Sequence, residues 1–323
     1  MKLAVGFLTY QEASAKYLEY FLPSLAAALS FLSPADFCIY AFDNSAAADL
    51  SNQKIVSAHQ NIKYLTQGRN LGFAAAYNIL IKAAIKAGAE YFLVINPDTM
   101  IEPGAIKILV EALDNDGSLG SASPKILRWD FAAGKKTEVI DSLGLVLSSG
   151  LKFGDLGQGS IDSRPVRSFP ILGPSGAAGL FRLEALARVA EANGVGPVQY
   201  FDERFFMYKE DCDLAYRLFL AGYNSRLVAE AIVYHDRTAA VSGQGITTFW
   251  RDRQSKSRQV RAWSFRNQHL LYFKHWKKQN FVNKFIIIFR VFSFLLFSLI
   301  LEKYLLKEYP KVWQLSRRLT NIK

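Results

Sequence analysis

Five carboxylates and four aromatic side chains share the fourteen residues from Phe201 to Leu214. A core segment rarely carries so many acids, and a solvated face rarely carries a run such as Phe205-Phe206-Met207-Tyr208. The mixture predicts a loop-to-helix junction at which carboxylates border an apolar pocket. Such a place suits a metal ion, a cationic ligand or a general base.

Glu210 and Asp211 begin the helix that follows this loop. A carboxylate near a helix N-terminus is favoured in its ionised form, which is the form that a general base needs. Asp211 is therefore the candidate base for an attacking hydroxyl group, with Glu210 beside it. The alternative is that Asp211 only caps the helix and that Asp213 is solvated.

Polar residues also follow three predicted strands. Asp43 could hydrogen-bond a pyrimidine base or a ribose, or cap the next helix. Asn96 and Asp98 follow a buried strand, where Asp98 could bind a divalent cation that carries phosphates, or form an ordinary turn. His235 could be a further metal ligand, contact phosphate or serve a structural role.

The turn at residues 68–74 opens another predicted helix. Its backbone N–H groups, around Gly72, and the side chains of Arg69 and Asn70 could meet a nucleotide. The spacing fits neither a P-loop nor GxGxxG, which argues against a Walker-type ATPase and a Rossmann dehydrogenase. Arg266, on a later helix, could clamp a pyrophosphate or lie on a basic surface.

The order of the predicted elements positions these residues. Short apolar runs alternate with helical patterns in the first part of the chain, which predicts an α/β fold with a mostly parallel central sheet flanked by helices. In such sheets ligands bind beyond the carboxyl ends of the strands, and Asp43 and Asp98 fall at such ends.

Charge divides the chain unevenly. Residues 251–323 hold 17 Lys+Arg and 3 Asp+Glu, whereas residues 1–250 hold 22 and 25. This contrast predicts a catalytic region over 1–250 and a basic, apolar helical region over 251–323, which could seek anionic lipid or nucleic acid. The two cysteines indicate neither a disulfide framework nor a zinc site, and no signal-peptide pattern is seen, so a cytoplasmic setting is expected.

The run Phe285–Leu301 contains a single charge, Arg290. A spanning helix needs ~20 apolar residues, and an arginine near the bilayer centre costs at least ~2.5 kcal/mol. Lysines and aromatic residues flank the run on both sides, which favours a helix that lies in an anionic membrane interface. Burial in a homodimer or against the core, and spanning, are the alternatives.

Taken in order, these pieces resemble glycosyltransferase family 2, the inverting glycosyltransferases with the A-type fold. The segments that carry the resemblance are Gly6–Tyr10, Asp43–Ser45, Arg69–Asn78, Asn96–Asp98, Ser175–Arg182, Phe201–Leu214 and Val233–His235. The match spans about residues 3–270 and is most specific over 201–214. It is similar to the rhamnosyltransferase-like branch that builds bacterial surface polysaccharides.

The resemblance implies a role for each matching residue. Asp98, with His235, would bind Mg²⁺ or Mn²⁺, and Asn96 stands where the strict metal motif has its first Asp. Asp211 would be the catalytic base, with Glu210 orienting the acceptor. The donor nucleotide would contact Thr9, Asp43, Arg69, Asn70, Gly72, Asn96 and Arg266.

The expected function is inverting, metal-dependent transfer of a sugar to a hydroxyl group of a glycan or a lipid-linked acceptor. The expected donor is dTDP-L-rhamnose, although a UDP-hexose or UDP-galactofuranose transferase would share most of these motifs. A non-catalytic basic protein that binds nucleic acid is less favoured, because the basic residues surround an apolar run that suits lipid better. We therefore expect an anionic membrane surface as partner, no nucleic acid, and peripheral attachment to the inner face of the cell membrane.

Overall fold

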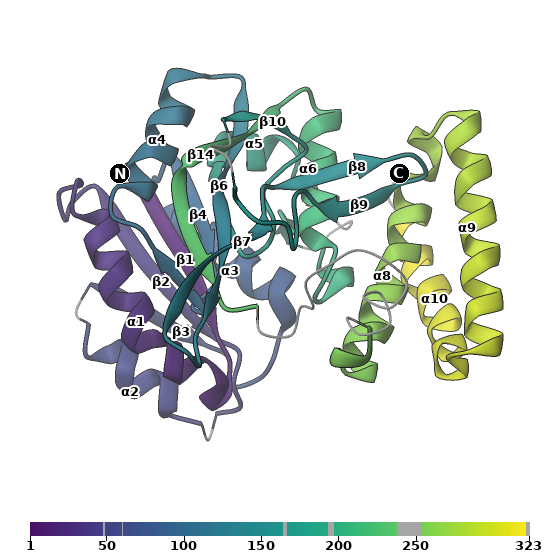
Figure 1. Ribbon diagram of the computed structural model, residues 1–323, viewed down its shortest axis with the longest axis horizontal. Coiled ribbons are helices and arrows are strands. Elements are labelled where there is room, and N and C mark those ends of the chain that lie inside the picture. Colours follow the sequence, from purple (N-terminus) through teal and green to yellow (C-terminus); the bar gives the residue numbers. More distant parts are fainter. Residues whose placement is uncertain (48, 60, 164–166, 193–196, 238–252, 321–323) are drawn as a thin grey trace.

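The computed structural model describes residues 1–47, 49–59, 61–163, 167–192, 197–237 and 253–320 (Figure 1). Its centre is a sheet with the strand order β10-β14-β6-β11-β4-β1-β2-β3, and helices cover both faces. The predicted α/β fold is confirmed. The boundary expected at residue 250 falls within 238–252, outside the described residues.

One side of the sheet is parallel, as predicted. Its strands are β1 (Leu3–Thr9), β2 (Phe37–Asp43), β3 (Ile62–Thr66) and β4 (Tyr91–Ile95), and its connections include α1 (Gln11–Leu29), α2 (Ser51–Ser57) and α3 (Gly72–Lys86). The register places Thr9 opposite Asp43. The carboxyl ends of these strands therefore meet at one edge of the sheet, where ligands bind in open α/β folds.

The other side of the sheet is mixed. β11 (Ala178–Arg182) runs antiparallel between β4 and β6 (Leu119–Asp130), and β14 (Asn224–His235) runs parallel to β6. Three further strands pair antiparallel with β6 or β14: β5 (Thr99–Ile101), β7 (Lys135–Ser142) and β10 (Phe169–Ile171). The β5–β14 pairing sets His235 opposite Thr99, and thereby next to Asp98.

The central strands are buried on both faces because successive side chains point to opposite sides. From β4, Leu93 joins the core beneath α1 and α4 (Ala105–Asn115), whereas Phe92 and Val94 join the core beneath α3. This second core also contains side chains of α5 (Leu183–Arg188) and α6 (Glu210–Leu220). Helix α6 is therefore fixed to the sheet by its apolar face, with its first turn near the strand ends.

The C-terminal helices share a core with the rest of the chain. They are α8 (Arg258–His275), α9 (Phe281–Ile300) and α10 (Glu308–Thr320), with the short turns η2 (Trp276–Lys278) and η3 (Lys303–Lys307). In Figure 1 the β8–β9 hairpin (Leu145–Ser148 and Lys152–Asp155) reaches towards them. Leu145, Phe205 and Cys212 lie in one cluster with Leu271 and Ile287. The short elements β12 (Glu191–Ala192), β13 (Val198–Gln199) and η1 (Glu203–Phe205) complete the fold.

Candidate active site

Two strand-end residues line the edge of the parallel half-sheet. Thr9 and Asp43 are almost fully buried, and Thr9 Oγ1 has no hydrogen-bond partner in the described part of the chain. Asp43 Oδ1 accepts from the backbone N–H of Ser45 at 2.9 Å, and its Oδ2 accepts from the Tyr64 hydroxyl. The Asp43 carboxylate is thus fixed in orientation, and each oxygen retains a lone pair for a ligand.

The turn before α3 makes internal contacts. Leu71 N–H donates to Asn44 Oδ1 at 3.0 Å, and Gly72 N–H donates to Asn70 Oδ1 at 2.8 Å. The N–H groups of the next two residues, 73 and 74, donate to the carbonyl oxygen of Phe206 at 2.7 and 3.3 Å. The prediction that backbone N–H groups here meet a nucleotide is therefore wrong for residues 71–74, because all four are engaged within the protein.

Gly72 has a steric reason to be glycine. Its φ is +78°, and an added Cβ would lie 2.5 Å from the carbonyl oxygen and ring of Phe206. Gly72 thus permits close packing of α3 against the loop that precedes α6. The side chains of Arg69 and Asn70 are exposed, so a donor would have to meet this turn through side chains rather than through these N–H groups.

Asp98 and His235 meet beside the β5–β14 pairing. His235 Nε2 lies 3.4 Å from Asp98 Oδ1, and the neighbouring Asp236 N–H donates to the Asp98 carbonyl oxygen at 2.9 Å. The two predicted metal residues are therefore adjacent. Asn96 is held nearby, since its N–H donates to the Ala177 carbonyl oxygen at 2.9 Å.

Asp141, on β7, orients the His235 ring. His235 Nδ1 lies 2.8 Å from Asp141 Oδ2, and Arg237 donates to Asp141 Oδ1 at 3.2 Å. Burial alone would lower the pKa of His235, but the carboxylates of Asp98 and Asp141 outweigh it and raise the pKa from 6.5 to about 10. A cation that binds at Nε2 must therefore displace a proton.

The chemistry of this corner fits a divalent cation. Asp98 Oδ1 and Asp236 Oδ1 are buried: no described residue donates a hydrogen bond to Asp236 Oδ1, and Asp98 Oδ1 has only His235 Nε2 near it, at 3.4 Å. Buried carboxylate oxygens without donors are unfavourable unless a cation neutralises them. Mg²⁺ and Mn²⁺ prefer carboxylate oxygen, and Mn²⁺ also accepts imidazole nitrogen.

Asp211 lies in the first turn of α6 and is half-buried. Its Oδ2 accepts from Gly176 N–H at 3.0 Å, and its Oδ1 accepts from Cys212 N–H at 2.7 Å. The next residue, Ala177, accepts a hydrogen bond from Asn96 N–H. Residues 176–177 therefore link the candidate base Asp211 to the Asn96–Asp98 turn. Sequence-predicted residues from three distant parts of the chain are thus brought together.

Glu210 has a different environment from Asp211. It is almost fully buried, and its Oε2 has no hydrogen-bond partner among the described residues. Burial, followed by the charge of Asp211, raises the pKa of Glu210 well above its ordinary value. Of the two adjacent carboxyls, Glu210 is therefore the one whose protonated form is favoured, so it is the poorer candidate for a base.

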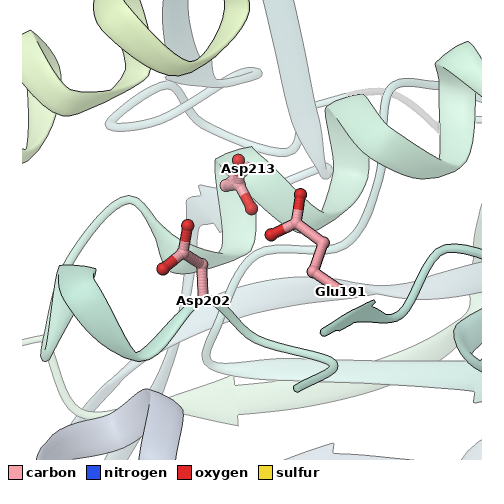
Figure 2. Close-up of side chains that lie close together, drawn as sticks. All are labelled: Glu191, Asp202 and Asp213. Atoms are coloured by element: carbon pink, nitrogen blue, oxygen red, sulfur yellow. The ribbon is translucent and has the colours of Figure 1, made fainter. Parts of the chain in front are cut away.

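A second group of acidic side chains, one of them on α6, forms an ion-pair network (Figure 2). Glu191, Asp202 and Asp213 point towards one another, an arrangement that could hold a metal. However, Lys274 Nζ lies 2.7 Å from the Glu191 carboxylate and 2.8 Å from each of the other two. The lysine ammonium occupies the position that a metal would need, so this group is structural.

The Asp213 carboxylate has two further partners besides Lys274. Arg217 donates to Oδ2 at 2.8 Å, and His275 Nε2 lies 2.8 Å from Oδ1. Burial would raise the pKa of Asp213, but the charges of Lys274 and Arg217 and the hydrogen bond with His275 hold that pKa well below its ordinary value. Asp213 is therefore a buried anchor and not a solvated residue.

Arg266 lies on α8, behind the loop before α6. Its Nη2 is 3.5 Å from the Phe205 carbonyl oxygen, and its Nε donates to Asn267 Oδ1 at 3.2 Å. No contact in the described residues joins Arg266 to Asp43 or Asp98.

Two residues near His235, Asp141 and Asp236, were not predicted from the sequence. Asp141 lies in a Gly/Ser-rich stretch without a motif, and Asp236 merely follows the histidine.

The fold and the strand-end carboxylates define a glycosyltransferase with an A-type fold. Two solved structures share the fold: Staphylococcus aureus TarS 1-349 in complex with UDP-GlcNAc (TM-score 0.56, 17% identity, 97% of this chain and 79% of that chain) and TarS 1-349 alone (TM-score 0.52, 16% identity, 98% and 80%). At these identities the likeness concerns the fold alone.

The sequence comparisons are more specific. The model for glycosyl transferase family 2 matches residues 5–128, and that for glycosyl transferase family group 2 matches residues 149–309. The chain is 30% identical to the N-acetylglucosaminyl-diphospho-decaprenol L-rhamnosyltransferase of Mycobacterium tuberculosis, in both strain CDC 1551 / Oshkosh and strain ATCC 25618 / H37Rv. The alignment extends over 246 residues and covers 73% of this chain and 76% of the relative. The chain belongs to glycosyltransferase family 2. Within it the chain is rhamnosyltransferase-like, and the less favoured prediction of a non-catalytic binding protein loses its support.

Proposed function

We propose that this glycosyltransferase transfers L-rhamnose from dTDP-L-rhamnose to a hydroxyl group of a lipid-linked glycan, with inversion at the anomeric carbon. The observation that carries the proposal is Asp211, whose carboxylate is held by Gly176 N–H at the start of α6. The name of the mycobacterial relative supports rhamnose as the sugar and a lipid-linked acceptor.

In the proposed reaction Asp211 accepts the proton of the acceptor hydroxyl as that oxygen attacks the anomeric carbon. The backbone donors on both Asp211 oxygens fix the carboxylate without neutralising it. The bond to the donor diphosphate breaks on the opposite face, so configuration inverts in a single displacement. General-base assistance of this kind contributes about 10²–10⁴-fold.

The donor side rests on the strand ends. We place the nucleotide base at Asp43, with Thr9, Arg69, Asn70, Asn96 and Arg266 as further donor contacts. Asp98 and His235 would hold Mg²⁺ or Mn²⁺, which offsets the charge of the departing diphosphate when it is bound. Asp141 then keeps the His235 ring turned so that Nε2, rather than Nδ1, faces Asp98.

Donor choice is tested by measuring sugar transfer and donor hydrolysis with dTDP-L-rhamnose, UDP-hexoses and UDP-galactofuranose. The proposal predicts turnover of dTDP-L-rhamnose and a product of inverted anomeric configuration. Turnover of UDP-sugars alone would reject the rhamnose assignment and favour the UDP-hexose or UDP-galactofuranose alternative.

We further propose that α9 attaches the protein to an anionic bilayer. By length and composition α9 could cross a membrane. One of its faces nevertheless packs on the protein through Ile287 and Ser298. The opposite face exposes apolar side chains at helical spacing, each between 36% and 83% exposed; this α9 stripe consists of Phe281, Phe285, Ile288, Phe289, Phe292, Leu295, Leu296, Leu299 and Ile300.

Arg290 favours a helix that lies in the interface. Its Nη1 donates to the Gly150 carbonyl oxygen at 3.0 Å, so the guanidinium is turned towards the β8–β9 hairpin and away from the α9 stripe. Exposed lysines at both ends of the helix, including Lys277, Lys278 and Lys303, match the charge of anionic headgroups. A helix with one face packed on protein and the other apolar suits the plane of a membrane better than a spanning position.

A further inference from the structure

The loop that connects η1 to α6 has an unfavourable backbone. Phe206, Tyr208 and Lys209 all have positive φ, at 61°, 72° and 73°. Non-glycine residues rarely adopt this region, and they remain there only where surrounding contacts impose it. Lys209 directly precedes Glu210 and Asp211, so the conformation of this loop sets where the first turn of α6 points.

Asn267 on α8 supplies those contacts. It is fully buried, and its Nδ2 donates to the carbonyl oxygens of Phe205, Met207 and Tyr208 at 2.7, 2.8 and 2.7 Å. The two N–H hydrogens of one amide group are thus shared among three carbonyl oxygens of the loop. The orientation of the amide is determined, because the opposite orientation would set Oδ1 against three carbonyl oxygens while Arg266 Nε donates to Oδ1 in the present one.

Helix α3 and Trp263 hold the same loop from other sides. The Phe206 carbonyl oxygen accepts from two N–H groups of α3, and the Phe206 ring packs on Trp263 with centroids 5.2 Å apart. These contacts fix Phe206 alone. Among the described residues, Asn267 is the side chain that ties both ends of the loop together.

We propose that Asn267 is a positioning residue for the transfer reaction: it holds the loop at residues 205–209 closed so that Asp211 faces the acceptor. The proposal rests on the assignment of Asp211 as the base. It also gives α8 a part in the catalytic site, although Asn267 itself touches neither donor nor acceptor.

Two variants test the proposal. Asn267→Ala removes the three hydrogen bonds, and Asn267→Asp keeps the shape of the side chain while it replaces the donor with oxygen. The matched control is Gln268→Ala, since the neighbouring Gln268 donates at 3.0 Å to the Leu151 carbonyl oxygen on the β8–β9 hairpin and not to the loop. Kinetics with dTDP-L-rhamnose and an acceptor are measured together with the rate of trypsin cleavage after Arg204 and Lys209.

Both Asn267 variants should lower kcat about 10- to 100-fold, because a displaced base affects the reaction. Asn267→Asp, which keeps Oδ1 as the acceptor for Arg266 Nε, should leave the KM for the donor within about twofold of wild type. Cleavage after Arg204 or Lys209 should become faster in these variants and stay at the wild-type rate in Gln268→Ala. The proposal would be overturned if the folded fraction of either variant had the wild-type kcat, with or without a raised donor KM. It would also be overturned if trypsin cleaved the variants at the wild-type rate.

The same data separate the proposal from the assignment on which it rests. If Asp211→Asn retains full transfer, the base assignment fails, whereas the cleavage rates still decide whether Asn267 closes the loop. If Asp211→Asn is inactive and the Asn267 variants keep wild-type kcat, only the positioning role fails.

Discussion

His235 Nε2 lies 3.4 Å from Asp98 Oδ1, although the two residues are 137 positions apart in the chain. The antiparallel pairing of β5 with β14 creates this proximity, and Asp141 fixes the ring from its other nitrogen. A carboxylate that orients a histidine towards a second carboxylate is a common arrangement at metal sites. Two motifs that are separate in the sequence, one at Asp98 and one at His235, therefore lie side by side in the candidate site.

Asp141→Asn should weaken the binding of Mn²⁺. The amide keeps the size of the side chain but loses the charge that orients His235, and loss of such a partner costs about 10–100-fold in metal affinity. The Mn²⁺ concentration for half-maximal activity, after removal of metal with a chelator, measures the effect. An unchanged Mn²⁺ requirement would show that Asp141 does not support the site, and full activity in the presence of the chelator would show that no cation acts at Asp98 and His235.

Lys274→Met should destabilise the fold strongly. The lysine ammonium is buried among three carboxylates, and removing one partner of a buried ion pair costs about 3–5 kcal/mol. Urea unfolding measures the loss. The exposed neighbour Lys277 provides the control, because Lys277→Met should stay within about 0.5 kcal/mol of wild type. A small loss for Lys274→Met would mean that the acidic group does not depend on this lysine.

Candidate site residues that lie in local motifs could be named from the sequence. Asp43, Asp98 and Asp211 were candidates because each follows or ends a strand or begins a helix at a recognisable pattern, and strand ends meet at one edge of a parallel sheet. The role of Gly72 was not predictable, because its steric partner Phe206 is distant in the chain and makes contact only in the folded structure.

Glu210→Gln should change how stability depends on pH. The raised pKa of Glu210 means that the folded state keeps a proton that the unfolded chain loses above about pH 4.3. Wild-type stability should therefore fall, relative to the non-titrating Gln variant, as pH rises from 5 to 8, by up to about 1.4 kcal/mol per pH unit. Urea unfolding at both pH values measures this, and a difference that stays constant with pH would contradict the buried, protonated state.

Phe285→Asp combined with Phe289→Asp should release the protein from vesicles that contain anionic lipid. Both side chains are about two-thirds exposed in the α9 stripe, so the substitutions should leave the melting temperature nearly unchanged. Phe219→Asp is the control, since Phe219 is 56% exposed on α6, outside the stripe. Sedimentation with vesicles gives the result. If the double variant still binds vesicles, α9 is not the membrane attachment. If the variant instead loses a dimer that the wild-type protein forms, the α9 stripe binds a second copy of the chain.

The C-terminal region was predictable in composition but not in placement. Its basic charge and apolar run indicated a membrane interface, yet they did not reveal that Arg290 turns to Gly150 or that Asn267 and Lys274 contact the segment before and within α6. Such contacts depend on long-range packing, which has no local signal in the sequence.

The most direct test of the account is the rate of L-rhamnose transfer by Asp211→Asn. The amide preserves the shape of the side chain but cannot accept the proton, so we predict a fall in kcat of about 10²–10⁴-fold with the donor KM close to wild type. Its NH2 group gives up one of the two backbone hydrogen bonds, so the melting temperature should fall only slightly. A folded Asp211→Asn enzyme that transfers the sugar at the wild-type rate would contradict the central claim that Asp211 is the catalytic base.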